Sequence, residues 1–103
     1  EFVGQTAEYP GGIQNFYGFV KDNMKYPAIA KDNNIQGKVY VRFVVEKDGS
    51  VGDAFILNKG KTHPSLEKEA IRVIKMSKNW APAQNNGIVV RSYYTIPINF
   101  KLG

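Results

Sequence analysis

Residues 37–51, GKVYVRFVVEKDGSV, decide the fold of this chain. Apolar and polar residues alternate along this stretch, which is the pattern of a β-strand with one buried face. The pair Asp48-Gly49 that follows the alternation is a strong signal for a hairpin turn. We therefore expect a strand, a tight turn and a second strand, with the rest of the chain packed around this hairpin. The residues expected to point into the core from the first strand are Val39, Val41, Phe43 and Val45.

Two amphipathic helices are predicted on either side of the hairpin in the sequence. Apolar residues recur at helical spacing in residues 13–24 and again in residues 65–77, where acidic residues lie near the start and lysines near the end. Thr62 or Ser65 is the expected N-cap of the second helix, because a side-chain hydroxyl there can accept a hydrogen bond from a free backbone N–H. A short helical turn is expected at residues 28–32, directly after a proline.

Two further strands are predicted from the remaining apolar runs. Residues 51–58 form the second strand, in which Gly52 indicates a bulge or a bend. Residues 79–87 read as a loop, and residues 88–101 then alternate as a last strand. Because proline cannot donate a hydrogen bond to a ladder, Pro97 places this last strand at an edge of the sheet.

The order of predicted elements is helix, strand, strand, helix, strand. A right-handed crossover through the second helix brings the last strand beside the first one. The expected fold class is therefore α+β: a three-stranded antiparallel sheet, in the order 2-1-3, with two helices packed on one face. The last strand keeps one free edge, and the outer face of the sheet displays Tyr40, Arg42, Arg91 and Tyr93.

Length and composition fit one globular domain over residues 1–103, with 43% hydrophobic and 22% charged residues. Residues 1–8 are expected to be flexible or to derive from an expression vector. The net charge is +5, and its whole excess lies in residues 51–103, which is compatible with an anionic partner and equally with a solubilising surface. No apolar run approaches the ~18 residues that cross a bilayer, so we expect any membrane anchor to lie outside this sequence.

Catalytic and metal-binding functions are disfavoured by the residue types that are missing. The chain has no cysteine and a single histidine, His63, so neither a nucleophile constellation nor a multi-histidine metal site can be assembled. His63 lies beside Pro64 at the start of the predicted helix, where a solvated or capping role fits. The run Gly60-Lys61-Thr62 is similar to the end of a phosphate-binding loop, but Phe55 stands where that motif needs a glycine. We therefore expect no enzymatic activity, no cofactor and no metal.

Three aromatic residues outside the predicted strands are candidates for contact with a binding partner. Trp80 is the single tryptophan of the chain, and tryptophan is enriched at binding hot spots. We nevertheless expect Trp80 to cap the core beneath Pro82. Tyr9 and Tyr26 each precede a proline and are likewise expected to pack rather than to bind.

The sequence resembles the C-terminal domain of TonB-type energy-transducing proteins, in particular a divergent bacterial branch. The resemblance covers nearly the whole chain, in order and at compatible spacing, and no single motif carries it alone. The matching motifs are YPGG at residues 9–12, YPAIA at 26–30, IQGKV at 35–39, FVV at 43–45, DGSV at 48–51, LEKEA at 66–70, WAPA at 80–83, NG at 86–87 and IPINF at 96–100.

This resemblance implies a function for the free strand edge. In the family the domain lies in the periplasm, and an inner-membrane helix and a proline-rich linker precede it and connect it to a proton-driven motor. An extended peptide from the N-terminus of an outer-membrane TonB-dependent transporter adds as a strand to the last strand of the domain, and force is transmitted to the transporter for nutrient uptake. The implied partner-binding residues are Val89, Val90, Arg91, Ser92, Tyr93, Tyr94, Thr95 and Ile96.

Other interpretations stay open at this point. The edge strand is alternatively a protected edge that binds nothing, or the seam of a strand-exchanged homodimer. The module is also reused in other membrane proteins, in which it does not energise transport. A basic sheet with exposed tyrosines resembles nucleic-acid-binding sheet modules, but the aromatic signature of those modules is missing from residues 37–45, so nucleic acid is not the expected partner.

Overall fold

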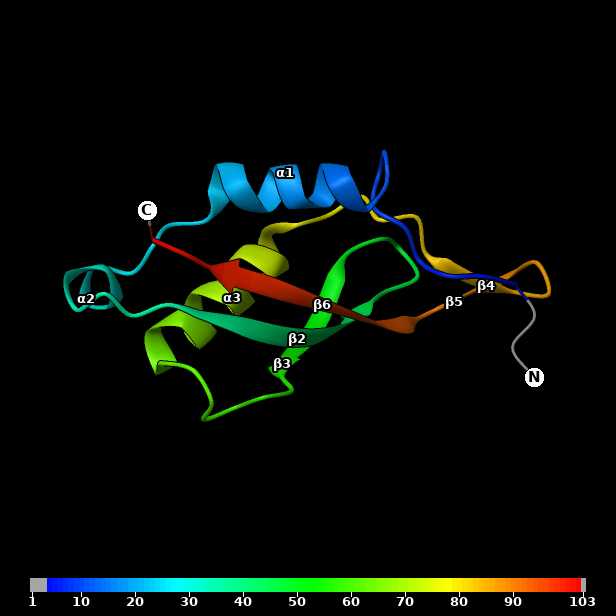
Figure 1. Cartoon of the computed structure of the whole chain (residues 1–103). Helices are drawn as coiled ribbons and strands as arrows, with labels where there is room; N and C mark the ends of the chain where they lie inside the picture. The colour runs from blue at the N-terminus through cyan, green and yellow to red at the C-terminus, as the bar shows by residue number, and fades with distance from the viewer. Residues whose placement is uncertain (1–3, 103) are drawn as a thin grey trace.

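The computed structural model describes residues 4–102. Within this range the chain forms two antiparallel sheets and three helices, with α1 lying above strand β6 in the view of Figure 1. The elements are β1 (Gly4–Gln5), α1 (Ile13–Asn23), α2 (Ala28–Asp32), β2 (Gly37–Val45), β3 (Val51–Ile56), α3 (Pro64–Met76), β4 (Ala83–Asn85), β5 (Ile88–Val90) and β6 (Ser92–Phe100).

The larger sheet confirms the predicted fold class and strand order. Its strands lie in the order β3-β2-β6, and both neighbours of β2 are antiparallel to it. Strand β2 is therefore central, and its register pairs Val39 with Ile98 and Phe43 with Tyr94 on β6. The alternation that predicted the strand also predicted its buried face, because Val39, Val41, Phe43 and Val45 are all fully buried.

The β2–β3 hairpin contains the predicted bulge at Gly52. Phe43 pairs with Ala54 and Val45 with Val51, so one residue of β2 faces two residues of β3, Gly52 and Asp53. The strand ends at Ile56 rather than at the predicted Asn58, but the Asn58 side chain continues the ladder. Its Oδ1 accepts a hydrogen bond from the Tyr40 N–H at 3.0 Å, and its Nδ2 donates to the Lys38 carbonyl at 3.0 Å.

The core lies between this sheet and the helices α1 and α3. Phe16 and Val20 of α1 are buried, as are Leu66 and Ile74 of α3. The N-cap of α3 is His63, whose Nδ1 accepts a hydrogen bond from the Ser65 N–H at 3.1 Å. The prediction of Thr62 or Ser65 as N-cap was wrong, because the imidazole nitrogen supplies the acceptor that a hydroxyl would otherwise provide.

Trp80 belongs to the core, as predicted. Its side chain is 2% exposed, and its ring lies 5.1 Å from the ring of Phe16, 5.4 Å from Phe43 and 5.1 Å from Tyr94, measured between centroids. The indole N–H donates a hydrogen bond to the Ser77 Oγ at 3.0 Å. The aromatic residues from α1, β2 and β6 thus pack around this tryptophan in the core and do not line a binding site.

A second sheet, in the order β1-β4-β5, was not predicted. The expected last strand over residues 88–101 is divided at Arg91, because β5 pairs with β4 whereas β6 pairs with β2. Strand β4 lies inside the stretch predicted as a loop. Asn86 and Gly87, with φ of 54° and 78°, close the β4–β5 hairpin, and positive φ at both positions is the requirement of a two-residue hairpin loop.

The N-terminal segment joins this second sheet. Gly4 pairs with Asn85, Ala7 is buried, and Glu8 forms a bridge to Ala81. We expected residues 1–8 to be flexible or vector-derived, and residues 4–8 instead belong to the fold. Residues 1–3 lie outside the described part of the chain.

Candidate functional site

The backbone of β6 has one side that β2 does not use. Tyr40 on β2 directs both of its backbone groups towards β3: its N–H donates to Asn58, and its carbonyl accepts from the Leu57 N–H at 2.8 Å. In an antiparallel ladder, pairs whose backbone groups bond each other alternate with pairs whose groups point away. Pro97, which lies opposite Tyr40, therefore directs its backbone away from β2.

The same alternation assigns every second residue of β6 to the free side. No described strand pairs with β6 there, since β6 ends the sheet. We call the outward backbone groups of four residues the β6 edge. Among them Pro97 offers only a carbonyl, because it has no N–H. The four residues of the β6 edge are Tyr93, Thr95, Pro97 and Asn99.

The structure distributes the predicted partner-binding residues over four environments. Val89 and Val90 lie in β5 and form a ladder with β4. Arg91 lies between β5 and β6. Ser92, Tyr94 and Ile96 direct their backbone groups to β2. Of the eight residues, the β6 edge contains Tyr93 and Thr95.

Arg91 forms an ion pair instead of standing free at the edge. Its Nε lies 3.1 Å from Oε1 of Glu46, and its Nη2 donates to Oε2 of the same carboxylate at 3.2 Å. These hydrogen bonds and the charge of Glu46 raise the pKa of Arg91 above its ordinary value. The pair joins Arg91, at the point where the chain passes from one sheet to the other, to Glu46, which directly follows β2.

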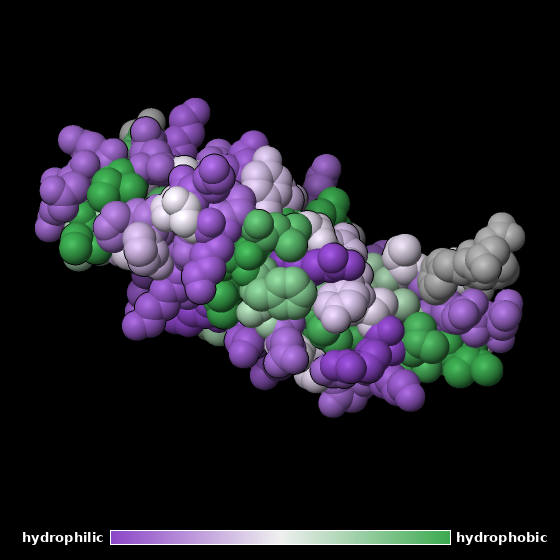
Figure 2. All heavy atoms as spheres, turned by 90° about the horizontal axis from the view of Figure 1, so that it is seen from below, coloured by the Kyte–Doolittle hydropathy of each residue, from purple (hydrophilic) through white to green (hydrophobic). Residues whose placement is uncertain are grey.

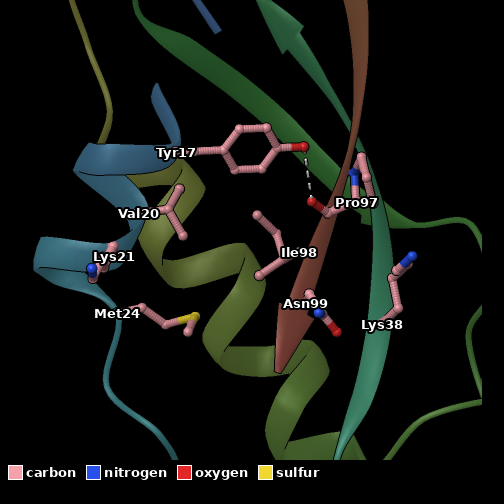
Figure 3. Close-up of a pocket in the computed structure, with 8 residues that line it drawn as sticks. All are labelled: Tyr17, Val20, Lys21, Met24, Lys38, Pro97, Ile98 and Asn99. Atoms are coloured by element: carbon pink, nitrogen blue, oxygen red, sulfur yellow. Dashed lines mark hydrogen bonds between the residues drawn. The ribbon is translucent and has the colours of Figure 1, made fainter. Parts of the chain in front are cut away.

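Helix α1 lies beside β6 (Figure 1), and side chains from the helix and the strand line a groove, part of which is drawn in Figure 3. The Tyr17 hydroxyl donates a hydrogen bond to the Pro97 carbonyl across the groove, at 3.4 Å. Burial, followed by the neighbouring Tyr94, raises the pKa of Tyr17 above its ordinary value of 10.0, so the hydroxyl keeps its proton at neutral pH. Sequence reasoning placed Tyr17 in the buried stripe of the helix, but its side chain is 40% exposed.

The Tyr17–Pro97 contact divides the groove into two hollows. We name each hollow after a β6 residue that lines it. The Thr95 hollow has a volume of about 350 Å³, and the Asn99 hollow has a volume of about 460 Å³. Both share Tyr17 and Pro97 as walls. The Thr95 hollow is also lined by Thr6, Ile13, Tyr93, Tyr94, Thr95 and Ile96, and the Asn99 hollow by Val20, Lys21, Met24, Lys38, Ile98 and Asn99.

The outer face of the sheet carries exposed aromatic side chains next to the β6 edge. The Tyr93 side chain is 58% exposed, the guanidinium carbon of Arg42 lies 4.5 Å from its ring centroid, and the Phe55 ring meets it edge-on at 6.2 Å. Figure 2 shows an area of hydrophobic atoms bordered by hydrophilic ones on the face seen from below. Because Arg42 already covers one face of the Tyr93 ring, this surface is a packed cluster rather than an open stacking platform.

Residues 4–102 offer neither a metal site nor a membrane-spanning helix. No group of three or more His, Asp or Glu side chains in this range lies close enough together to hold a metal ion. None of the described helices combines the length and the apolar character needed to span a membrane. The unpaired β6 edge and the groove beside it are therefore the features that define the class of this protein: a small α+β domain with an open strand edge.

Comparison with known proteins shows which family this class corresponds to. The family described as Gram-negative bacterial TonB protein C-terminal matches residues 22–102. The chain belongs to this TonB C-terminal family.

Relatives from one organism support the assignment. Protein TonB of Helicobacter pylori (strain J99 / ATCC 700824) is 28% identical over 107 residues, an alignment that covers 96% of this chain and 36% of the relative. The chain thus spans about a third of the length of that relative. A solution structure of the H. pylori TonB C-terminal domain is similar with a TM-score of 0.64 and 25% identity, and covers 85% of this chain and 90% of that one. A longer form of the same domain gives a TM-score of 0.65 at 24% identity, covering 91% and 87%.

Proposed function

We propose that this chain is the periplasmic partner-binding domain of a TonB-type energy transducer. It docks the N-terminal peptide of an outer-membrane transporter by strand addition along the β6 edge and transmits force for nutrient uptake. The parent protein is anchored in the inner membrane by a segment N-terminal to this domain, which links it to a proton-driven motor. The domain itself acts by binding and carries out no chemistry.

The observation that supports strand addition is the row of unused backbone groups at Tyr93 and Thr95. Each of these residues offers one N–H and one carbonyl to the groove, so a partner strand finds two donors and two acceptors in register. Their side chains lie on the exposed outer face, where they leave the approach along the groove free. Membership of the TonB C-terminal family makes a transporter peptide the expected strand.

The length of the available edge limits the affinity that the backbone can provide. Four backbone hydrogen bonds contribute about 2–6 kcal/mol in net terms. Association alone costs at least ~4 kcal/mol, and a micromolar complex needs about 8 kcal/mol beyond that cost. The ladder at Tyr93 and Thr95 therefore selects an extended peptide, and side-chain contacts in the groove supply most of the binding free energy.

An NMR titration of the 15N-labelled domain tests this function. The probes are short peptides from the periplasmic N-termini of outer-membrane transporters of the source organism. We expect chemical-shift changes and slowed hydrogen exchange at the Tyr93 and Thr95 amides, and loss of both when a proline is placed in the middle of the peptide. Absence of any shift along β6 with every peptide would contradict the proposal.

A further inference from the structure

The Asn99 hollow is larger than the Thr95 hollow, and a strand docked along Tyr93 and Thr95 leaves it unfilled. It lies on the far side of the Tyr17–Pro97 contact from Thr95. A docked strand that pairs with Tyr93 and Thr95 meets an interruption of the ladder at this contact, because Pro97 has no N–H and the Tyr17 hydroxyl already donates to its carbonyl. The next side chain of the peptide therefore arrives at the mouth of the hollow.

The walls of the hollow are apolar at the base. Figure 3 shows Val20 from α1, Met24 directly after the end of α1 and Ile98 from β6 pointing towards one another between the helix and the strand. A volume of about 460 Å³ lies within the usual range of small-ligand pockets, roughly 300–1,000 Å³. The thioether of Met24 is flexible and adapts to side chains of different shape. An aliphatic or aromatic side chain of a peptide fits this composition.

The rim of the hollow is cationic. Lys21 stands on the α1 side and Lys38 on β2 beyond the strand, and no Asp or Glu belongs to the lining. Both lysines are exposed, and neither forms an ion pair within the described residues. Two unpaired ammonium groups on opposite sides of one apolar hollow favour a carboxylate beside the apolar group that enters it.

We propose that the Asn99 hollow is an anchor pocket for an apolar side chain that is followed or preceded by a carboxylate on the docked peptide. This inference rests on the proposed strand addition and adds a chemical class to the partner: a peptide whose end beyond the ladder is apolar and acidic. It also accounts for the binding free energy that the short ladder does not supply.

The first arm of the test probes the hollow without any ladder. The chain contains two methionines, Met24 in the hollow and Met76 on α3, so methyl-13C methionine labelling gives one reporter and one internal control. The probes are 4-phenylbutyrate and its neutral analogue 4-phenylbutyramide. We expect the acid to shift the Met24 methyl signal with an affinity about fivefold higher than the amide, and to leave Met76 unchanged, as fits two exposed ion pairs.

A matched pair of variants identifies the charges. The double substitution Lys21→Gln and Lys38→Gln should bring the acid to the affinity of the amide, and it leaves the core and the β6 edge untouched. Lys59→Gln with Lys75→Gln removes the same charge from lysines that do not line the hollow and should change nothing. Equal affinities of acid and amide for the unmodified protein would contradict the proposal that Lys21 and Lys38 favour a carboxylate. An equal loss of affinity for the acid in both double variants would contradict it as well.

The second arm separates the pocket from the ladder. Peptides built on Thr-Val-Thr-Val-Thr are extended at either end by Phe-Asp, Phe-Asn or Ala-Asp, because the direction of the docked strand is open. We expect all to shift the Tyr93 and Thr95 amides, and Phe-Asp at one end to bind about tenfold more tightly than Ala-Asp. If the peptides shift the Tyr93 and Thr95 amides but Phe-Asp and Ala-Asp peptides bind with equal affinity, the anchor-pocket proposal is contradicted while strand addition is supported. A Met24 response to phenylbutyrate with no ladder shift from any peptide would instead contradict strand addition and the peptide assignment.

Discussion

The hydroxyl of Tyr17 and the carbonyl of Pro97 meet across the groove at 3.4 Å, although 80 residues separate them in the chain. This hydrogen bond engages one of the two lone pairs of the Pro97 carbonyl. Together with the missing N–H of Pro97, it separates the outward backbone groups of Tyr93 and Thr95 from those of Asn99. Two features of the sequence, a tyrosine on the flank of a helix and a proline in an edge strand, combine to shape one site.

Tyr17→Phe should release the Pro97 carbonyl and tighten peptide binding. One additional backbone hydrogen bond predicts an affinity about threefold higher, with a change in unfolding free energy within about 0.5 kcal/mol because the residue is partly exposed. Fluorescence anisotropy with a labelled peptide measures the affinity. Tyr26→Phe is the matched control, since it removes another tyrosine hydroxyl that donates to a backbone carbonyl, that of Ile35, away from the groove. Weaker binding of Tyr17→Phe would show that the hydroxyl contacts the peptide instead.

Gly49→Ala should be strongly destabilising, whereas Gly60→Ala should be mild. Both glycines have nearly the same left-handed φ, +86° and +85°, so the two substitutions share a backbone cost of about 1–2 kcal/mol. A Cβ at Gly49 would lie 2.4 Å from the carbonyl oxygen of Trp80, whereas a Cβ at Gly60 would have nothing within 4 Å. We expect a loss of about 3 kcal/mol or more at Gly49, measured by urea unfolding. Equal losses at both positions would contradict the close approach of the β2–β3 turn to Trp80.

Ser77→Ala should destabilise the core through Trp80. The substitution removes the acceptor of the buried indole N–H, and an unpaired buried donor costs about 1–3 kcal/mol. The control is a double-mutant cycle with Trp80→Phe, because the loss at Ser77 should shrink once no indole N–H is present. An undiminished loss in that background would assign the effect to the second hydrogen bond of Ser77, which its hydroxyl donates to the Ile74 carbonyl at 2.6 Å.

The carboxylate of Glu69 should make stability depend on pH in the acid range. Burial opposes its ionisation, but hydrogen bonds from Arg72 and from the Lys25 N–H prevail and lower its pKa below the ordinary value of 4.5. A folded-state pKa below the unfolded one stabilises the protein above pH 4.5 and loses this contribution as the pH falls through the folded-state value. Glu69→Gln should therefore cost about 1–2 kcal/mol at pH 7 and progressively less below pH 4.5. A difference that is constant from pH 7 to pH 3 would contradict this account.

The larger sheet was predictable because its signals are long and local. Apolar and polar residues alternate along β2 with Val44 as the one exception, the Asp48-Gly49 turn fixes the hairpin, and the handedness of the crossover through α3 then places β6 beside β2. The second sheet escaped prediction because β1, β4 and β5 have only two or three residues each, too few to show a period. Its signal is Asn86-Gly87, a strong hairpin pair at the end of the stretch predicted as a loop.

The candidate site was predictable as a strand but not as a surface. Period-two alternation identified Tyr93 and Thr95 on an edge strand, yet it could not show that Val89 and Val90 form a ladder with β4. At the division of the strand, Arg91 contacts Glu46, which is 45 residues away in the chain and therefore invisible to any local pattern. The groove depends on how α1 packs along β6, which no local pattern encodes.

Peptide binding by two proline variants tests strand addition at the β6 edge most directly. Thr95→Pro and Asn99→Pro each remove one outward N–H, from opposite sides of the Tyr17–Pro97 contact, and neither removes a bond to β2. We predict that Thr95→Pro weakens binding of a transporter peptide about tenfold or more, because it removes a donor and leaves a peptide carbonyl unpaired, whereas Asn99→Pro changes the affinity less than about twofold. Unchanged affinity of a correctly folded Thr95→Pro protein, judged by its intact β2–β6 amide signals, would contradict the account.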